Sequence, residues 1–121
     1  IWTHNLLEPE LGMGGWPGHP DTVVGESPIV AAFGEYAGDM AEEFGAKIDT
    51  WITINEPMSM LMGGYVAAFF PPGKSFQIET TMRGLFNIVY AHAAGYDAIH
   101  ARDLVDADSQ RYARLTNARQ L

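Results

Sequence analysis

The sequence has 121 residues, of which 47% are hydrophobic and 18% are charged. This length suits one ordinary domain, and the apolar content supports a packed interior, which excludes an intrinsically disordered chain. Fifteen acidic residues against seven basic ones give a net charge of -8, and the arginines are scattered among aspartates, so we expect no nucleic-acid partner.

The sequence contains no cysteine, which excludes disulfide and thiolate chemistry. This fits a reducing compartment and favours the cytoplasm, although the location stays open. No apolar run approaches the roughly 18 residues needed to cross a bilayer, so no membrane partner is expected. The chain starts with Ile1 in what we interpret as a strand end, and we expect truncation at both ends.

The first predicted elements are a strand end, a loop and a helix. Residues 12–28 are rich in glycine and proline and predict a long loop. Ser27 and Pro28 predict a helix start, and Gly45 predicts its end. Apolar residues recur between them at helical spacing, so we expect a helix from about 28 to 44. Its expected buried face comprises Ile29, Phe33, Tyr36, Ala37, Met40, Ala41 and Phe44.

The second half of the sequence predicts a strand, a loop, a helix and a short final strand. Bulky and β-branched residues over 48–54 indicate a strand, which ends where Pro57 prevents the ladder from continuing. A loop over 58–75, a helix over about 81–103 and a strand over 112–116 follow. The expected apolar face of this helix comprises Met82, Leu85, Phe86, Val89, Ala93, Tyr96 and Ile99 or His100.

This alternation of strands and helices predicts an α/β fold with parallel strands. Both longer loops follow strand ends and precede helices, which is the side on which a (β/α)8 barrel builds its active site. A doubly wound sheet would give the same alternation, so the pattern leaves both architectures open.

Asn55 and Glu56 stand at the end of the predicted 48–54 strand. A carboxyl group there would be partly desolvated, which is an environment suited to a proton donor near neutral pH. A neighbouring amide can bind a substrate hydroxyl without adding charge. The tripeptide Asn-Glu-Pro alone could equally cap a strand and open a loop.

Residues 51–57, Trp-Ile-Thr-Ile-Asn-Glu-Pro, resemble the acid/base segment of family 1 glycoside hydrolases, the β-glucosidase family. Flanking motifs follow in the family's order, and the resemblance covers nearly the whole chain. It implies that residues 1–121 are one partial (β/α)8 barrel domain, from the end of strand three to strand five, which needs the rest of the barrel. The flanking motifs are Gly15-Trp16, Glu43-Phe44-Gly45, Gly64-Tyr65, Pro71-Pro72-Gly73 and Ala91-His92-Ala93.

The resemblance implies a role for several residues. Glu56 matches the general acid/base, Asn55 the residue that binds the sugar 2-hydroxyl, and His4 a histidine that contacts another sugar hydroxyl. Trp16 and Tyr65 could line the aglycone side, although pinning loops to the barrel rim is the favoured role for both. Asn117 follows the last predicted strand and could also face the site.

The implied activity is double-displacement hydrolysis of β-linked glucosides or related glycosides, with a small carbohydrate substrate. No segment matches the family's nucleophile strand, so we expect the chain alone to be inactive. The family usually has an aromatic residue where Asn5 stands, which supports the alternative of a non-catalytic homologue that binds carbohydrate or a protein partner. No cluster has metal-ligand spacing, and we expect neither a metal nor a cofactor. His92 and His100 are expected to pack or to contact solvent.

Overall fold

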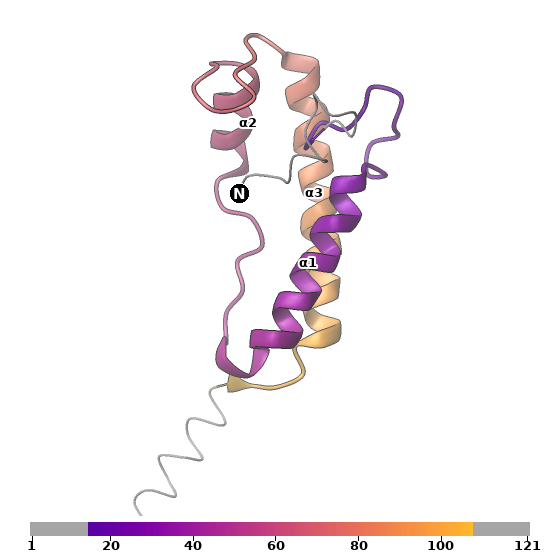
Figure 1. Cartoon of the computed structure of the whole chain (residues 1–121), viewed down its shortest axis with the longest axis vertical. Helices are drawn as coiled ribbons and strands as arrows, with labels where there is room; N and C mark the ends of the chain where they lie inside the picture. Colours follow the sequence, from indigo (N-terminus) through magenta and orange to yellow (C-terminus); the bar gives the residue numbers. More distant parts are fainter. Residues whose placement is uncertain (1–14, 108–121) are drawn as a thin grey trace, which may run out of the picture.

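The computed structural model describes residues 15–107 of the chain. These residues form helix α1 (Pro28–Phe44), the 3-10 turn η3 (Gly45–Lys47), helix α2 (Pro57–Tyr65) and helix α3 (Ile78–Arg102). Figure 1 shows α1 and α3 packed along each other, with α2 beside the first part of α3. An extended segment, residues 48–56, runs from η3 to the start of α2. None of these helices is long and apolar enough to cross a membrane.

Helix α1 confirms the expected bounds of 28–44, with Pro28 at its first position. Ser27 does not cap the helix, because its side chain makes no capping hydrogen bond. Gly45 also differs from expectation, since its φ of -52° and ψ of -42° are right-handed helical values. The chain therefore tightens into η3 after Phe44, and no left-handed glycine stops the helix.

Small residues set the contact between α1 and α3. A Cβ atom at Gly34 would lie 3.2 Å from the Cβ of Ala94, and one at Gly95 would lie 2.8 Å from the Phe33 ring. The two helices can approach this closely because these positions carry little or no side chain. The expected apolar face of α3 is therefore confirmed only at Ile99, which is buried, and at Leu85, which is partly buried against the main core. The residues of α3 that are buried are Thr81, Gly84, Asn87, Ile88, Ala91, Gly95 and Ile99.

Several large apolar side chains of α3 are exposed in the described part of the chain. Met82, Phe86, Val89 and Tyr96 are all exposed among the described residues, although they dominate the helical pattern of the sequence. The helix also begins at Ile78, earlier than expected. An apolar pattern reveals that a helix has a hydrophobic side, but glycine and alanine add little to that pattern even when they form the contact face.

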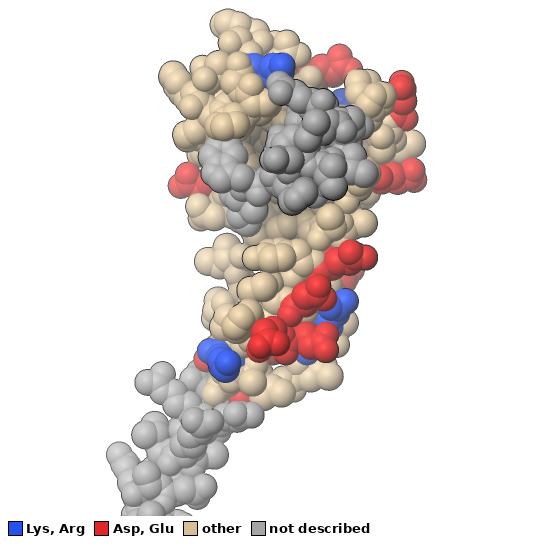
Figure 2. Space-filling view, viewed as in Figure 1, with Lys and Arg blue, Asp and Glu red and all other residues tan. Residues whose placement is uncertain are grey.

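The expected face of α1 is confirmed at Ile29, Phe33, Ala37 and Ala41 but not at Tyr36, which is 55% exposed. The acidic residues of α1 lie at the surface. Figure 2 shows acidic side chains gathered along the surface that α1 forms, with basic side chains next to them. Arg102 of α3 pairs there with Asp39 and Glu42.

Residues 48–54 do not form the expected strand. Within residues 15–107, the β pairing consists of one isolated bridge between Ala67 and Ser75. A strand needs a neighbouring strand to bind its backbone N–H and C=O groups. The 48–54 segment has no such neighbour in the described part of the chain, so its β-branched composition gives an extended but unpaired segment.

Helix α2 replaces the first part of the loop expected over 58–75. Pro57 occupies its first position, where the missing N–H costs nothing. Leu61 and Tyr65, one turn apart, are buried. The following loop folds back on the end of this helix, since the Phe70 N–H donates to the Gly63 carbonyl at 3.0 Å and the Lys74 N–H to the Gly64 carbonyl at 2.8 Å.

The main hydrophobic core joins the glycine-rich loop to all three α-helices. It contains a ring from the loop, apolar residues from α1 and α3, and both buried side chains of α2. This core fixes where α2 begins relative to α3. Its members are Trp16, Ile29, Val30, Phe33, Leu61, Tyr65, Ile88 and Ala91.

Candidate functional site

Glu56 lies at the N-cap of α2 in an unusual backbone conformation. Its φ of 46° and ψ of 55° are left-handed, which costs a residue with a side chain about 1 to 2 kcal/mol. Its carbonyl accepts hydrogen bonds from the N–H groups of Ser59 and Met60 at 3.1 and 3.4 Å. Strained backbone of this kind clusters at functional sites, because the surrounding structure must compensate for it.

The Glu56 carboxylate is held by its own helix. The Ser59 hydroxyl donates to Glu56 Oε2 at 3.1 Å. Glu56 and Asn55 are both exposed among the described residues. We expected this carboxyl group to be partly desolvated. Within residues 15–107 it is exposed, because no neighbouring strand or loop of that range covers it.

A groove of about 560 Å³ separates the segment before Asn55 from α3. Two hydrogen bonds join its walls. The Trp51 Nε1–H donates to Asp103 Oδ2 at 2.7 Å, and Thr53 Oγ1 lies 2.6 Å from His92 Nδ1. The groove is lined by Asp49, Thr50, Trp51, Ile52, Thr53, Ile54, His92, Tyr96, Ile99, His100 and Asp103.

The two histidines of α3 differ in their contacts. His92 reaches across the groove to Thr53, a bond that sequence reasoning did not predict. His100 stays on its own helix, where its ring stacks on Tyr96 at 4.0 Å and its Nδ1 lies 3.0 Å from the Tyr96 carbonyl oxygen. Both side chains are exposed in the described part of the chain.

Trp16 and Tyr65 are core residues in this structure. Each is only 6% exposed, and the Trp16 ring packs on the Phe33 ring with centroids 6.0 Å apart. Their burial supports the favoured interpretation, in which these rings pin loops. A contact with an aglycone stays a prediction for both.

Two polar residues of α3 hold the glycine-rich loop. Asn87 is 1% exposed, and its Nδ2 donates to the carbonyls of Trp16 and Pro17 at 2.9 and 3.0 Å. Its Oδ1 accepts from the Gly25 N–H at 2.7 Å. Sequence reasoning missed this role, and the signal that could have indicated it is an asparagine within an otherwise apolar stretch of helix.

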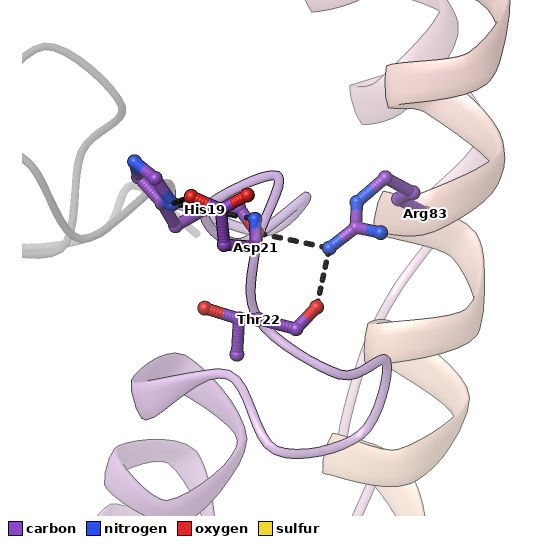
Figure 3. A network of polar contacts seen from close by, with 4 residues as sticks. All are labelled: His19, Asp21, Thr22 and Arg83. Carbon is purple, nitrogen blue, oxygen red and sulfur yellow. Dashed lines mark hydrogen bonds and ion pairs between the residues drawn. The ribbon is translucent and has the colours of Figure 1, made fainter.

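Arg83 adds a second anchor one turn before Asn87. Figure 3 shows its guanidinium turned toward the loop, where Nη2 donates to the carbonyls of His19 and Thr22 at 2.9 and 2.7 Å. His19 and Asp21 of the loop pair with each other at 3.4 Å. The loop between the first predicted strand end and α1 is thereby fastened to α3.

Two further residues were predicted from the sequence to contact the substrate. His4 and Asn117 lie outside the described residues. No group of three or more His, Cys, Asp or Glu side chains that could hold a metal ion occurs within residues 15–107.

Comparison with known proteins identifies the family. The model of glycosyl hydrolase family 1 matches residues 12–111. The chain belongs to this family. The family 1 assignment confirms the resemblance drawn from the Asn55-Glu56 segment and its flanking motifs.

Several curated family 1 relatives are similar to this chain. A β-galactosidase of Pyrococcus woesei is 35% identical over 114 residues, which are 88% of this chain and 21% of that protein. A cytosolic β-glucosidase of Cavia porcellus is 36% identical over 84 residues, 69% of this chain and 17% of that protein. A 6-phospho-β-galactosidase of Lacticaseibacillus rhamnosus is 43% identical over 61 residues, 50% of this chain and 13% of that protein.

The chain spans about a fifth or less of the length of these relatives. No solved structure matches it.

Proposed function

We propose that this chain carries the acid/base segment of a retaining β-glycosidase and forms part of its (β/α)8 barrel. The observation that carries the proposal is Glu56, held in a left-handed conformation at the start of α2 and preceded by Asn55. The family 1 match over residues 12–111 surrounds this segment. The rest of the barrel comes from the longer protein of which these residues are a portion.

In this proposal Glu56 first acts as an acid and then as a base. It protonates the glycosidic oxygen as the bond to the leaving group breaks, and it later removes a proton from the attacking water. The Ser59 hydroxyl donates a hydrogen bond to Oε2. Because Oε2 is the acceptor of this bond, Oε1 is the oxygen that carries the proton in the acid form. Asn55 binds the sugar 2-hydroxyl, a contact that strengthens in the transition state.

A second carboxylate completes the mechanism. In retaining enzymes it lies about 5 to 5.5 Å from the first and attacks the anomeric carbon. We propose that the remainder of the longer protein supplies it. The relatives named above are a β-galactosidase, a β-glucosidase and a 6-phospho-β-galactosidase, so the proposed substrate class is small β-linked glycosides.

The replacement of Glu56 by glutamine in the longer protein tests this assignment. For an alkyl β-glycoside, whose poor leaving group needs a proton, kcat/KM should fall by roughly 10² to 10⁴ because general acid catalysis is lost. For a dinitrophenyl β-glycoside the first chemical step should change much less, which pre-steady-state release of dinitrophenol measures.

Glu79→Gln is a matched control, since Glu79 is another exposed glutamate near the start of a helix, in the first turn of α3. It should leave both rates unchanged. Equal activity of the Glu56→Gln and unchanged proteins on the alkyl glycoside would remove Glu56 from the mechanism.

The asparagine at position 5, where the family usually has an aromatic residue, favours a second candidate function. This is a non-catalytic homologue that binds carbohydrate or a protein partner. Hydrolysis of an aryl β-glycoside by the longer protein would decide against it, whereas sugar binding without any turnover would favour it.

A further inference from the structure

The bond between Thr53 and His92 connects the catalytic segment to α3. Thr53 stands three residues before Glu56, and its Oγ1 lies 2.6 Å from His92 Nδ1. Within residues 15–107 this segment takes part in no strand ladder. Two side-chain hydrogen bonds link the segment to α3, the Trp51–Asp103 bond at one end of the groove and the Thr53–His92 bond closer to Glu56.

Helix α3 is a suitable frame for this purpose. It has 25 residues and packs against α1 through close contacts at Gly34 and Gly95. It also contacts α2, where Leu61 has no exposed surface and lies against Gly84. Thr53 precedes Glu56 and Leu61 follows it, and both contact α3.

We propose that His92 is a positioning residue for the general acid. Through Thr53 it holds the backbone that leads into Asn55 and Glu56, so that the Glu56 carboxyl reaches the glycosidic oxygen. This inference rests on the proposed function of Glu56. Proton transfer needs hydrogen-bond distance between the acid and the leaving oxygen, so a small displacement of the segment slows the acid-dependent step most.

His100 provides the comparison that separates positioning from ordinary helix packing. It is an exposed histidine on the same helix, two turns further along, but its contacts are with Tyr96 of that helix. A substitution at His100 removes a ring from the groove without releasing the catalytic segment. A general effect of altering α3 would therefore appear at both histidines, whereas positioning would appear only at His92.

The test measures kcat/KM in the longer protein with an alkyl and with a dinitrophenyl β-glycoside. His92→Ala should lose roughly tenfold with the alkyl glycoside and less than twofold with the activated one. His92→Asn should restore most of the loss, because an amide places a polar atom near the position of Nδ1. Thr53→Val, which keeps the shape but removes the hydroxyl, should reproduce the His92→Ala pattern, and His100→Ala should change neither rate.

Equal losses with both substrates in the His92→Ala and Thr53→Val proteins would overturn the inference, as would the same pattern at His100. If His92→Ala prevents folding, Thr53→Val decides the question by the same two rates. Glu56→Gln is measured in parallel to keep the two proposals apart. A leaving-group effect at Glu56 but none at His92 or Thr53 overturns only the positioning role, while its absence at Glu56 overturns both.

Discussion

Asn87 and Glu56 show how differently single residues can be predicted from sequence. Glu56 was found because the motif around it is specific to a family, although its left-handed backbone and its exposure among the described residues could not be foreseen. The structural role of Asn87 was missed because a polar residue in an amphipathic helix is normally assigned to solvent. Its partners are backbone groups 62 to 71 residues away, and helical periodicity contains no information on such contacts.

The three loop contacts of Asn87 predict a large effect on stability. Asn87→Ala would leave the Gly25 N–H and the carbonyls of Trp16 and Pro17 without their partner in a buried place. We expect the free energy of unfolding of the longer protein to fall by about 2 to 4 kcal/mol, since each buried unsatisfied group costs about 1 to 3 kcal/mol. Urea denaturation measures this change.

Asp97→Ala is the matched control for stability, because Asp97 is an exposed polar residue of the same helix. It should change the free energy of unfolding by less than about 0.5 kcal/mol. A similar small change for Asn87→Ala would show that the loop is held by other contacts.

For the helices, the sequence patterns predicted where an element begins and ends better than they predicted which side of it is buried. The start of α1 was predicted correctly because Pro28 suits the first position of a helix. Its end was also predicted correctly, although Gly45 continues right-handed into η3 and is not a left-handed stop.

Most of the contact face of α3, apart from Leu85 and Ile99, was predicted wrongly because small residues such as Gly84, Ala91 and Gly95 form it. Helix α2 was missed since Gly63-Gly64 and the prolines after it are typical of a loop.

The close approach of α1 and α3 predicts that Gly34 tolerates no branched side chain. A Cβ atom alone would already lie 3.2 Å from Ala94 Cβ, so Gly34→Val should force the helices apart. We expect a loss of about 1 to 3 kcal/mol in the free energy of unfolding of the longer protein, as is usual for overpacking.

Ala31→Val on the same helix is the control, because Ala31 is exposed in the described chain. It introduces the same side chain away from the contact and should cost less than about 1 kcal/mol, mainly in helix propensity. Equal losses from both substitutions would mean that the helix contact is looser than the structure shows.

At the scale of the whole molecule, the sequence predicted a strand over 48–54 that the described residues do not form. The strand end at residue 1 and the strand over 112–116 lie outside those residues. Segment 48–54 has strand composition but no neighbour in the described part of the chain, and α3 exposes Met82, Phe86 and Val89 there. Both features are expected of a portion whose strand partners and helix cover lie elsewhere in a longer barrel. The barrel is implied by the family alone, because strand pairing is a property of the complete sheet.

The most direct test of the central claim, that Glu56 is the acid/base of a retaining β-glycosidase, is the product formed by Glu56→Ala in the presence of azide. Azide needs no general base, so it should attack the covalent glycosyl intermediate in place of water. With a dinitrophenyl β-glycoside as substrate, the account predicts faster turnover on addition of azide and a β-glycosyl azide, identified by NMR, because two displacements retain the anomeric configuration. An α-glycosyl azide would contradict the account, since it would assign the nucleophile's role to Glu56.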